Sequence, residues 1–436
     1  MSTLRRRLNV FDLTLITIGS IIGSGIFRNP AVVASRAHLP TLAIGCWVVG
    51  GLLALIGAFV FAELAQRRPV DGGLYAYLRD AYHPAVGFVF GWTLLWIADT
   101  GGTAAAAVLL APYLTQLTGL ALDTRIVAVV TLAVLVGINC LGVRQGGTWQ
   151  NALVILKVTA IVGLIAAGLF THPAAGAAAT LPGFDSSTAL VGAFGIAMLP
   201  VLFSYNGFQG ATYITGETVE PERTIPRGLI FGVLAVIAIY VLVNIGCLRV
   251  LGAAGLAATK VPATEVMQAA LGPIGARLIA VAIALSTLGF MSTRMLVTPR
   301  IYLQMAADGT FPKQIAWINP KTRVPTVAII LQGVIAAIIA LNKFDQIVNW
   351  IVAPEWIFVV LAAGAVFIFR KRDGDAIKPA IQVPLHPFST MLLMAVLLAI
   401  FVTEVVLVPL DTLYGTLVIV AGFIFYDVWR RVGAVA

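Results

Sequence analysis

The stretch Ile18-Gly-Ser-Ile-Ile-Gly-Ser-Gly-Ile-Phe27 lies in the middle of the first long apolar run of the sequence. Each of its three glycines costs roughly 1 kcal/mol in a helix interior relative to alanine. Within a lipid bilayer, every backbone group that such a break frees must find a partner, so a break is tolerated where it lines a protein cavity. The stretch therefore predicts a membrane-spanning helix that is interrupted at mid-depth.

The composition of the whole chain supports a membrane location. Its 436 residues are 60% hydrophobic and 11% charged, whereas soluble domains are about 45–50% apolar and about 25% charged. A span needs about 20 mostly apolar residues, and this rule predicts an all-α polytopic membrane protein with about twelve transmembrane helices. The expected spans are residues 11–36, 42–66, 85–116, 125–142, 147–170, 189–216, 228–250, 276–303, 325–342, 347–369, 388–407 and 411–429.

The positive charges predict the orientation of these spans. With the N-terminus inside, 19 of the 28 Lys and Arg residues fall on the cytoplasmic side and 7 on the other. Because basic residues are enriched in cytoplasmic loops, both termini are expected in the cytoplasm. No small-residue cleavage site follows the first apolar run, so we expect no removed signal peptide.

A second interruption, Phe203-Ser-Tyr-Asn-Gly-Phe-Gln-Gly210, falls in the sixth span. Interrupted spans at corresponding positions of two halves indicate an inverted-repeat transporter with a midplane site. The N–H groups after Gly25 suit a carboxylate, and carbonyls near Ile21 and Phe203 can accept from an ammonium group. The alternative is that these glycines only allow helices to pack closely.

Other classes of site lack a sequence pattern. Cys46, Cys140 and Cys247 are far apart in apolar runs, and the four histidines form no metal constellation, so no metal and no cofactor is expected. No hydrolase or nucleotide-binding motif appears, which argues against an enzyme. The net charge of +9 comes from residues at the ends of apolar segments, so we expect a lipid bilayer and no nucleic acid as partner.

Several short motifs, in order along the chain, carry a family resemblance. They are Gly23-Ser-Gly-Ile-Phe27, Ala62-Glu-Leu-Ala65 with Tyr77-Leu-Arg79 and Gly91-Trp92, Phe203-Ser-Tyr-Asn-Gly207 running to Thr215-Gly-Glu217, and Pro299-Arg-Ile-Tyr302 followed by Asp308-Gly309 and Phe311-Pro312. On these residues the chain resembles the amino acid–polyamine–organocation (APC) superfamily, especially its L-type amino acid transporter (LAT) branch in a prokaryotic, stand-alone form.

The resemblance implies the leucine-transporter-type fold with a 5+5 inverted repeat and broken helices 1 and 6. The first repeat would span residues 1–170, the second 189–370, and two extra helices 388–431, all in one integral membrane domain. It implies no disulfide-linked heavy chain, because the loop near Thr118–Thr124 has no cysteine. The substrate-binding residues it implies are Ile21, Gly23, Ser24, Gly25, Phe203, Ser204, Asn206 and Gly207, with Phe203 also a candidate lid.

Ionisable residues inside the spans are functional candidates, because charge is costly in the bilayer. Lys157 is expected to reach the carbonyls of Gly19–Ile22 and hydroxyl groups of the eighth span (Ser286, Thr287 or Ser292), as the matching lysine does in sodium-independent relatives, and so to act in gating or coupling. Asp99 and Arg294 form either an ion pair or a substrate side-chain pocket, and Glu355 is similarly open. Glu63 and Glu217 are expected to form ion pairs at helix ends, with Arg79 or Arg227.

The sequence therefore predicts a secondary active amino acid transporter that works by alternating access in a plasma membrane, as in the inner membrane of a bacterium. The sequence does not decide whether transport is sodium-independent exchange or proton-coupled uptake, nor whether the protein is a monomer or a homodimer. The alternatives are an ion or water channel, for which no filter sequence is visible, and a polyamine or cationic amino acid carrier of the same family.

Overall fold

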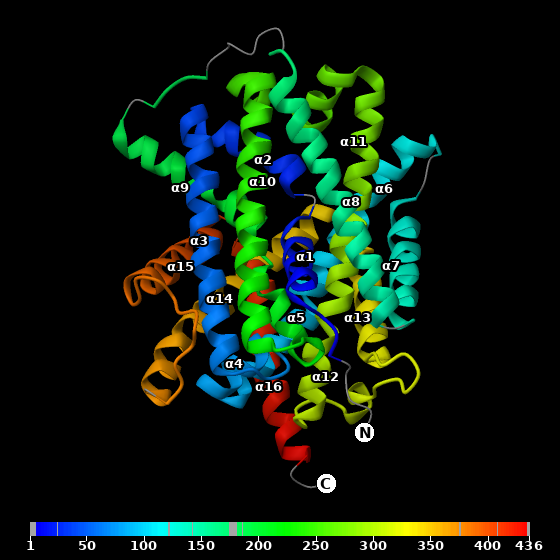
Figure 1. Cartoon of the computed structure of the whole chain (residues 1–436), viewed down its shortest axis with the longest axis vertical. Helices are drawn as coiled ribbons and strands as arrows, with labels where there is room; N and C mark the ends of the chain where they lie inside the picture. Colours follow the sequence, from blue (N-terminus) through cyan, green and yellow to red (C-terminus); the bar gives the residue numbers. More distant parts are fainter. Residues whose placement is uncertain are drawn as a thin grey trace.

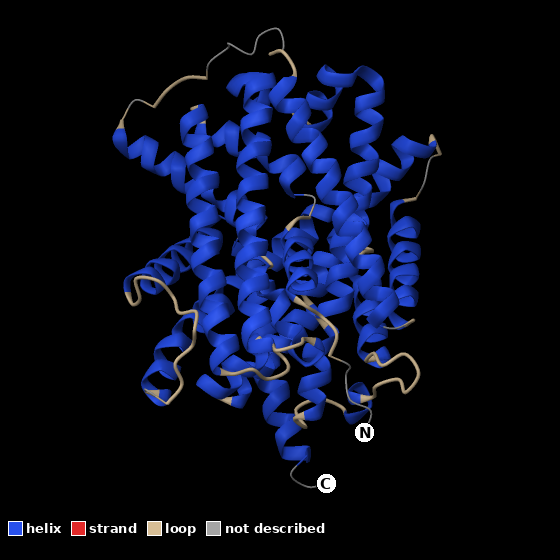
Figure 2. Cartoon of the chain, in the orientation of Figure 1, coloured by secondary structure: helices blue, strands red, loops and turns tan. Residues whose placement is uncertain are grey.

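The structure is a computed structural model that describes residues 6–23, 25–120, 123–141, 143–173, 181–184, 186–374, 376–407 and 409–433. Within these ranges the chain forms a bundle of upright helices (Figure 1) and no β-strand (Figure 2). The elements are α1 (Val10–Ile21), α2 (Gly25–Ala37), α3 (Pro40–Arg67), α4 (Leu74–Ala81), α5 (Pro84–Trp96), α6 (Ala98–Thr118), α7 (Thr124–Cys140), α8 (Val143–Phe170), α9 (Ser187–Tyr205), the 3₁₀ helix η1 (Phe208–Glu217), α10 (Pro221–Ala258), α11 (Pro262–Val297), α12 (Pro299–Ala307), the 3₁₀ helix η2 (Lys313–Ala316), α13 (Thr326–Ile339), α14 (Phe344–Asp373), α15 (Phe388–Leu407) and α16 (Pro409–Gly433).

Every expected span coincides with a helix or with a broken run of helices. Among the described residues, eight helical runs are long and apolar enough to cross a membrane, or nine if the bent pair α1–α2 counts as one span. The remaining expected spans coincide with the shorter apolar helices α7 and α13 and with α14. The predicted all-α polytopic architecture is therefore confirmed.

Some boundaries differ from the sequence prediction because the backbone bends inside an apolar run. The expected span 85–116 is divided at Ile97 into α5 and α6. α10 and α11 are longer than predicted, since each continues past a kink at a glycine with positive φ, Gly252 (φ 70°) and Gly272 (φ 63°). Hydropathy alone does not locate such kinks, because each of them falls within a long, mostly apolar run.

Small residues allow the central helices to approach closely, as is common where helices pack within membranes. On α3, a Cβ added at Gly50 would lie 2.4 Å from the Val201 side chain, and one at Gly57 would lie 2.6 Å from the Phe208 ring. α3 also packs along α10, and α6 packs along α11. The second and third expected spans thus contact the seventh and eighth.

The two chain ends lie at the same end of the bundle (Figure 1). There the N-terminal segment is fixed to η1, because the backbone N–H groups of Arg7 and Leu8 donate to the Glu217 carbonyl at 2.8 and 3.0 Å. The buried Glu217 carboxylate accepts from Arg300 Nε at 2.8 Å. These contacts hold the segment before α1 and the start of α12 against the end of η1.

The predicted partners of the two acidic residues at helix ends were wrong. Glu217 pairs with Arg300, and Glu63 pairs with Arg67 at 2.9 Å and Arg370 at 2.7 Å. Arg79 instead pairs with Asp80 and Asp308. These arginines are distant in sequence or lie one helical turn away, and charge patterning alone could not choose among them.

Candidate functional site

The first break separates α1 from α2. α1 ends at Ile21, Ile22 is extended (φ −74°, ψ 100°), and α2 begins at Gly25 at an angle of 49° to α1. Ser24, a predicted site residue, lies outside the described residues. The break leaves carbonyl groups at the end of α1 and N–H groups at the start of α2, which are the backbone groups that the glycine-rich stretch predicted.

Lys157 on α8 supplies partners for the carbonyls that this break frees. Its side chain is fully buried, and Nζ donates to the Ile22 carbonyl at 2.5 Å and to the Gly19 carbonyl at 3.5 Å. The expected hydroxyl contacts from α11 to this lysine are not made among the described residues. Ser286 Oγ instead donates to the Gly23 carbonyl at 3.4 Å. The ammonium group therefore holds the end of α1 to α8.

The second break separates α9 from η1. α9 ends at Tyr205, Asn206 is extended (φ −67°, ψ 152°), and Gly207 has a φ of 107°. Residues with a Cβ rarely adopt such a φ. A Cβ at Gly207 would also lie 2.4 Å from the carbonyl oxygen of Ser20. The glycine is therefore required both by its backbone conformation and by direct contact between the two broken helices.

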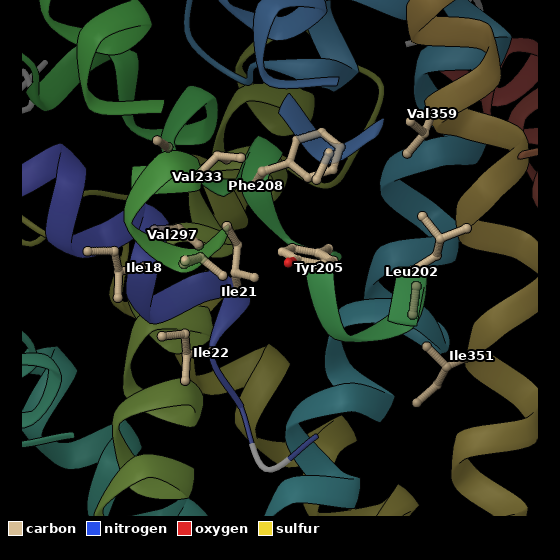
Figure 3. Packing of buried hydrophobic residues seen from close by; sticks show 14 of the residues in the cluster. Ile18, Ile21, Ile22, Leu202, Tyr205, Phe208, Val233, Val297, Ile351 and Val359 are labelled. Atoms are coloured by element: carbon tan, nitrogen blue, oxygen red, sulfur yellow. The ribbon is translucent and has the colours of Figure 1, made fainter. Parts of the chain in front are cut away.

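Tyr240 on α10 bridges the two breaks. Its hydroxyl is within 3.0 Å of the Ser204 carbonyl and 3.5 Å of the Ile21 carbonyl, to which it can donate. Its ring packs against Trp47 and Tyr205, with centroid separations of 5.4 and 5.0 Å. Figure 3 shows Tyr205 and Ile21 together in this buried region. Tyr240 is one of several polar residues in the apolar run of α10, among them Asn244 and Arg249, so the sequence alone did not single it out.

A cavity of about 110 Å³ opens between the two breaks. It is lined by Ile21, Gly23, Gly25, Ala98, Asp99, Gly102, Ala105, Ala106, Phe203, Ser204, Asn206, Tyr240, Thr287, Phe290, Arg294, Phe344, Ile351 and Glu355. Of the predicted substrate-binding residues, the structure brings all but Ser24 and Gly207 to this wall, and Gly207 lies directly behind it. The small residues of α6 and the aromatic residues Phe290 and Phe344 were not predicted.

The ionisable residues that the sequence left open meet at this cavity. Arg294 on α11 forms a buried ion pair with Asp99 on α6, through Nη1 and Oδ1. Thr298 Oγ1 donates to the other oxygen of Asp99. Glu355 on α14 accepts a hydrogen bond from Gln209 Nε2 at 3.1 Å. Asp99 and Arg294 are thus an ion pair whose members also line the cavity.

Phe203, the candidate lid, is partly exposed at the cavity wall. Its side chain is 38% exposed although it lines the cavity, whereas its neighbours Leu202 and Ser204 are both 4% exposed. Ser204 is fixed at the wall, because its hydroxyl donates to the Pro200 carbonyl at 2.7 Å and accepts from Asn29 Nδ2 at 2.7 Å. The arrangement can enclose a small polar molecule between backbone groups on one side and charged side chains on the other.

Comparison with known proteins agrees with this geometry. The family model described as amino acid permease matches residues 8–424. The chain belongs to the amino acid permease family. It is 32% identical over 432 residues to the serine/threonine exchanger SteT of Bacillus subtilis (strain 168), covering 97% of this chain and 96% of that protein.

Other relatives of this permease are animal transporters. The human b(0,+)-type amino acid transporter 1 is 27% identical over 432 residues, which are 98% of this chain and 88% of that protein. The human cystine/glutamate transporter is 25% identical over 388 residues, which are 88% of this chain and 77% of that protein. The permease is therefore a multi-pass membrane protein that transports amino acids and not an enzyme. Its resemblance to the APC superfamily and the LAT branch is confirmed.

Proposed function

We propose that this permease is a sodium-independent exchanger of small neutral amino acids that works by alternating access in the plasma membrane of a bacterium. The observation that carries the proposal is the cavity bounded by both helix breaks, Ile21–Gly25 and Phe203–Asn206. The 32% identity to a serine/threonine exchanger over nearly the whole chain supports exchange and a small polar substrate.

The backbone groups of the breaks would bind the part that all amino acids share. The α-carboxylate fits the N-terminus of α2 at Gly25, where free N–H groups and the helix dipole favour an anion. The α-amine fits the carbonyl side of the breaks, near Ile21 and Phe203. Some of those carbonyls already accept hydrogen bonds, since Asn206 N donates to the Phe203 carbonyl at 3.3 Å, so each would accept the ammonium as a second donor.

Lys157 supports independence from sodium. Its ammonium group already lies on the Gly19 and Ile22 carbonyls, where a cation would otherwise be needed to bind the interrupted end of α1. A fixed positive charge disfavours a second cation at the same carbonyls. Lys157 would therefore hold α1 to the scaffold throughout the cycle without a bound ion.

The internal symmetry and the surroundings of the chain belong to the same proposal. Residues 1–170 and 189–370 would form the two inverted repeats, which the packing of α3 on α10 and of α6 on α11 supports. Both termini would be cytoplasmic. Transport would need no disulfide-linked heavy chain, because Cys46 and Cys247 are buried, Cys140 is half-buried at the end of α7, and the sequence near Thr118–Thr124 has no cysteine.

The test is counterflow in proteoliposomes loaded with single amino acids, with choline in place of sodium. We expect saturable exchange of labelled serine or threonine and at least tenfold weaker competition by the methyl ester or the N-acetyl derivative, since either change removes one charge of the shared backbone part. Conductance without saturation would indicate a channel instead. Equal competition by the methyl ester would show that the backbone groups of the breaks do not bind the α-carboxylate.

A further inference from the structure

Three acidic or basic side chains are among the described residues that line the cavity, and their charges do not cancel. Asp99 and Glu355 are carboxylates, and Arg294 is the one cation among the described residues of the cavity wall. Fully ionised, the three sum to −1. Lys157 does not offset this charge at the wall, because its ammonium group lies outside the lining, on the backbone carbonyls of α1.

Arg294 is already paired with Asp99. The two side chains are 8% and 2% exposed and bonded directly. The remaining contacts of the guanidinium group are with α1 and α11, since Nη2 lies 3.5 Å from the Ser20 carbonyl and the group stands 5.1 Å from the centre of the Phe290 ring. A buried arginine that is already paired in this way compensates the charge of one carboxylate, here Asp99. Glu355 therefore receives only part of the electrostatic stabilisation that Arg294 can provide.

Glu355 faces the cavity beside the amide side chains of Gln209 and Asn206, and none of the described residues gives it a cation of its own. Its side chain is partly exposed, and Oε1 accepts from Gln209 of η1. The ionisable groups that face it are Asp99 on α6, Arg294 on α11 and Tyr213 on η1. The phenol of Tyr213 is buried without a hydrogen-bond partner among the described residues, and it carries no positive charge.

We propose that Glu355 is a proton-binding site, which takes up one proton when the cavity closes around a neutral amino acid. This inference rests on the proposed function. While the cavity is open, water solvates the carboxylate. Closure removes that water, and a neutral amino acid brings no net charge to replace it, so an enclosed excess carboxylate would be costly.

A proton cancels the excess charge with little change in the contacts of Glu355. The proton comes from water on the open side, binds one carboxylate oxygen, and returns to water when the cavity opens again. Oε1 can keep its hydrogen bond from Gln209 while the other oxygen carries the proton. Each enclosed neutral substrate would then cross the membrane together with one proton. The transported pair carries a charge of +1, while the enclosed site as a whole is neutral.

The experiment measures binding to the purified full-length protein and does not depend on the transport mode. Titration calorimetry with serine or threonine, at one pH in two buffers of different ionisation enthalpy, gives the number of protons taken up. We expect about one proton for the wild type, and an affinity that falls about tenfold per pH unit once Glu355 is ionised in the free protein. Glu355→Gln should bind with the same affinity at every pH and take up no proton.

Two further variants make the result decisive. Glu222→Gln changes an exposed carboxylate in the first turn of α10 and should keep the wild-type profile. If Glu355→Gln does not bind, Glu355→Asp decides, since it should retain the proton uptake.

Wild-type binding without proton uptake would overturn the proposal. So would stronger binding of lysine or ornithine than of serine, with no proton taken up, because the substrate cation would then balance Glu355. Absence of any amino acid binding by the wild type and by Glu222→Gln would instead refute the proposed function on which the inference depends.

Discussion

Replacement of Gly207 tests whether direct contact between the two broken helices is needed for transport. Gly207 has a φ of 107°, and its added Cβ would lie 2.4 Å from the Ser20 carbonyl oxygen and 2.9 Å from Arg294 Nη2. The nearest obstacle is backbone, which cannot rotate away as a flexible side chain would. Gly207→Ala should therefore separate α1 from η1 or change the conformation of the second break.

The expected cost follows from two contributions. A positive φ costs an alanine roughly 1–2 kcal/mol relative to glycine, and overpacking a tight site costs roughly 1–3 kcal/mol. Together they amount to about 3 kcal/mol, or about a hundredfold change in an equilibrium constant. Because the contact joins the ends of the two broken helices, this cost should fall on every state in which they stay in contact, and Gly207→Val should be at least as severe.

The assay is initial-rate counterflow in proteoliposomes with equal amounts of inserted protein. Gly207→Ala should lower the rate about a hundredfold while the protein still inserts. Gly137→Ala is the matched control, because Gly137 lies on an exposed face of α7 with nothing within 4 Å of its added Cβ. Gly25→Ala should have an intermediate effect, since its Cβ would meet only side chains, at 3.3 Å. A rate for Gly207→Ala within twofold of the wild type would refute the reasoning.

Three further predictions concern buried polar groups around the site. Lys157→Ala should lower uptake measured in choline roughly ten- to a hundredfold, because two buried carbonyls lose their hydrogen-bond donor. Strict sodium dependence of the wild type would contradict the role of Lys157 in place of a bound cation. Tyr240→Phe should lower the counterflow rate about fivefold, which corresponds to the loss of about 1 kcal/mol. Tyr205→Phe should change the rate little, because the Tyr205 hydroxyl donates to the Trp47 carbonyl at 3.0 Å and not to the breaks. Equal effects of the two variants would show that the Tyr240 bridge plays no part in transport. Arg300→Gln should lower the melting temperature by several degrees, because it leaves the buried Glu217 carboxylate unpaired, and adding Glu217→Gln should restore part of the loss; a wild-type melting temperature for the single variant would show that the pair contributes nothing.

Local backbone chemistry made the two breaks predictable. Glycine and serine between Ile18 and Phe27, and asparagine and glycine at 206–207, disfavour a continuous helix at any position in any fold. The structure interrupts the chain at these places, at Ile22 and at Asn206–Gly207. The contact of Lys157 with the carbonyls of α1 was also predicted, although through the family resemblance, since its distance of 135 residues from Ile22 has no local signature.

The all-helical membrane architecture, the approximate positions of the spans and the two interruptions follow from hydropathy and glycine content, because these act over a single turn or a single span. Which charges meet depends on how the helices pack. Asp99 pairs with Arg294 across 195 positions, and Glu217 pairs with Arg300 and not Arg227. Among the described residues, Glu355 has no cation of its own. Ion pairing depends on which faces of α6, η1, α11 and α14 turn toward one another. That rotation is set by the packing of the whole bundle, where small residues permit close approach, and no single segment encodes it.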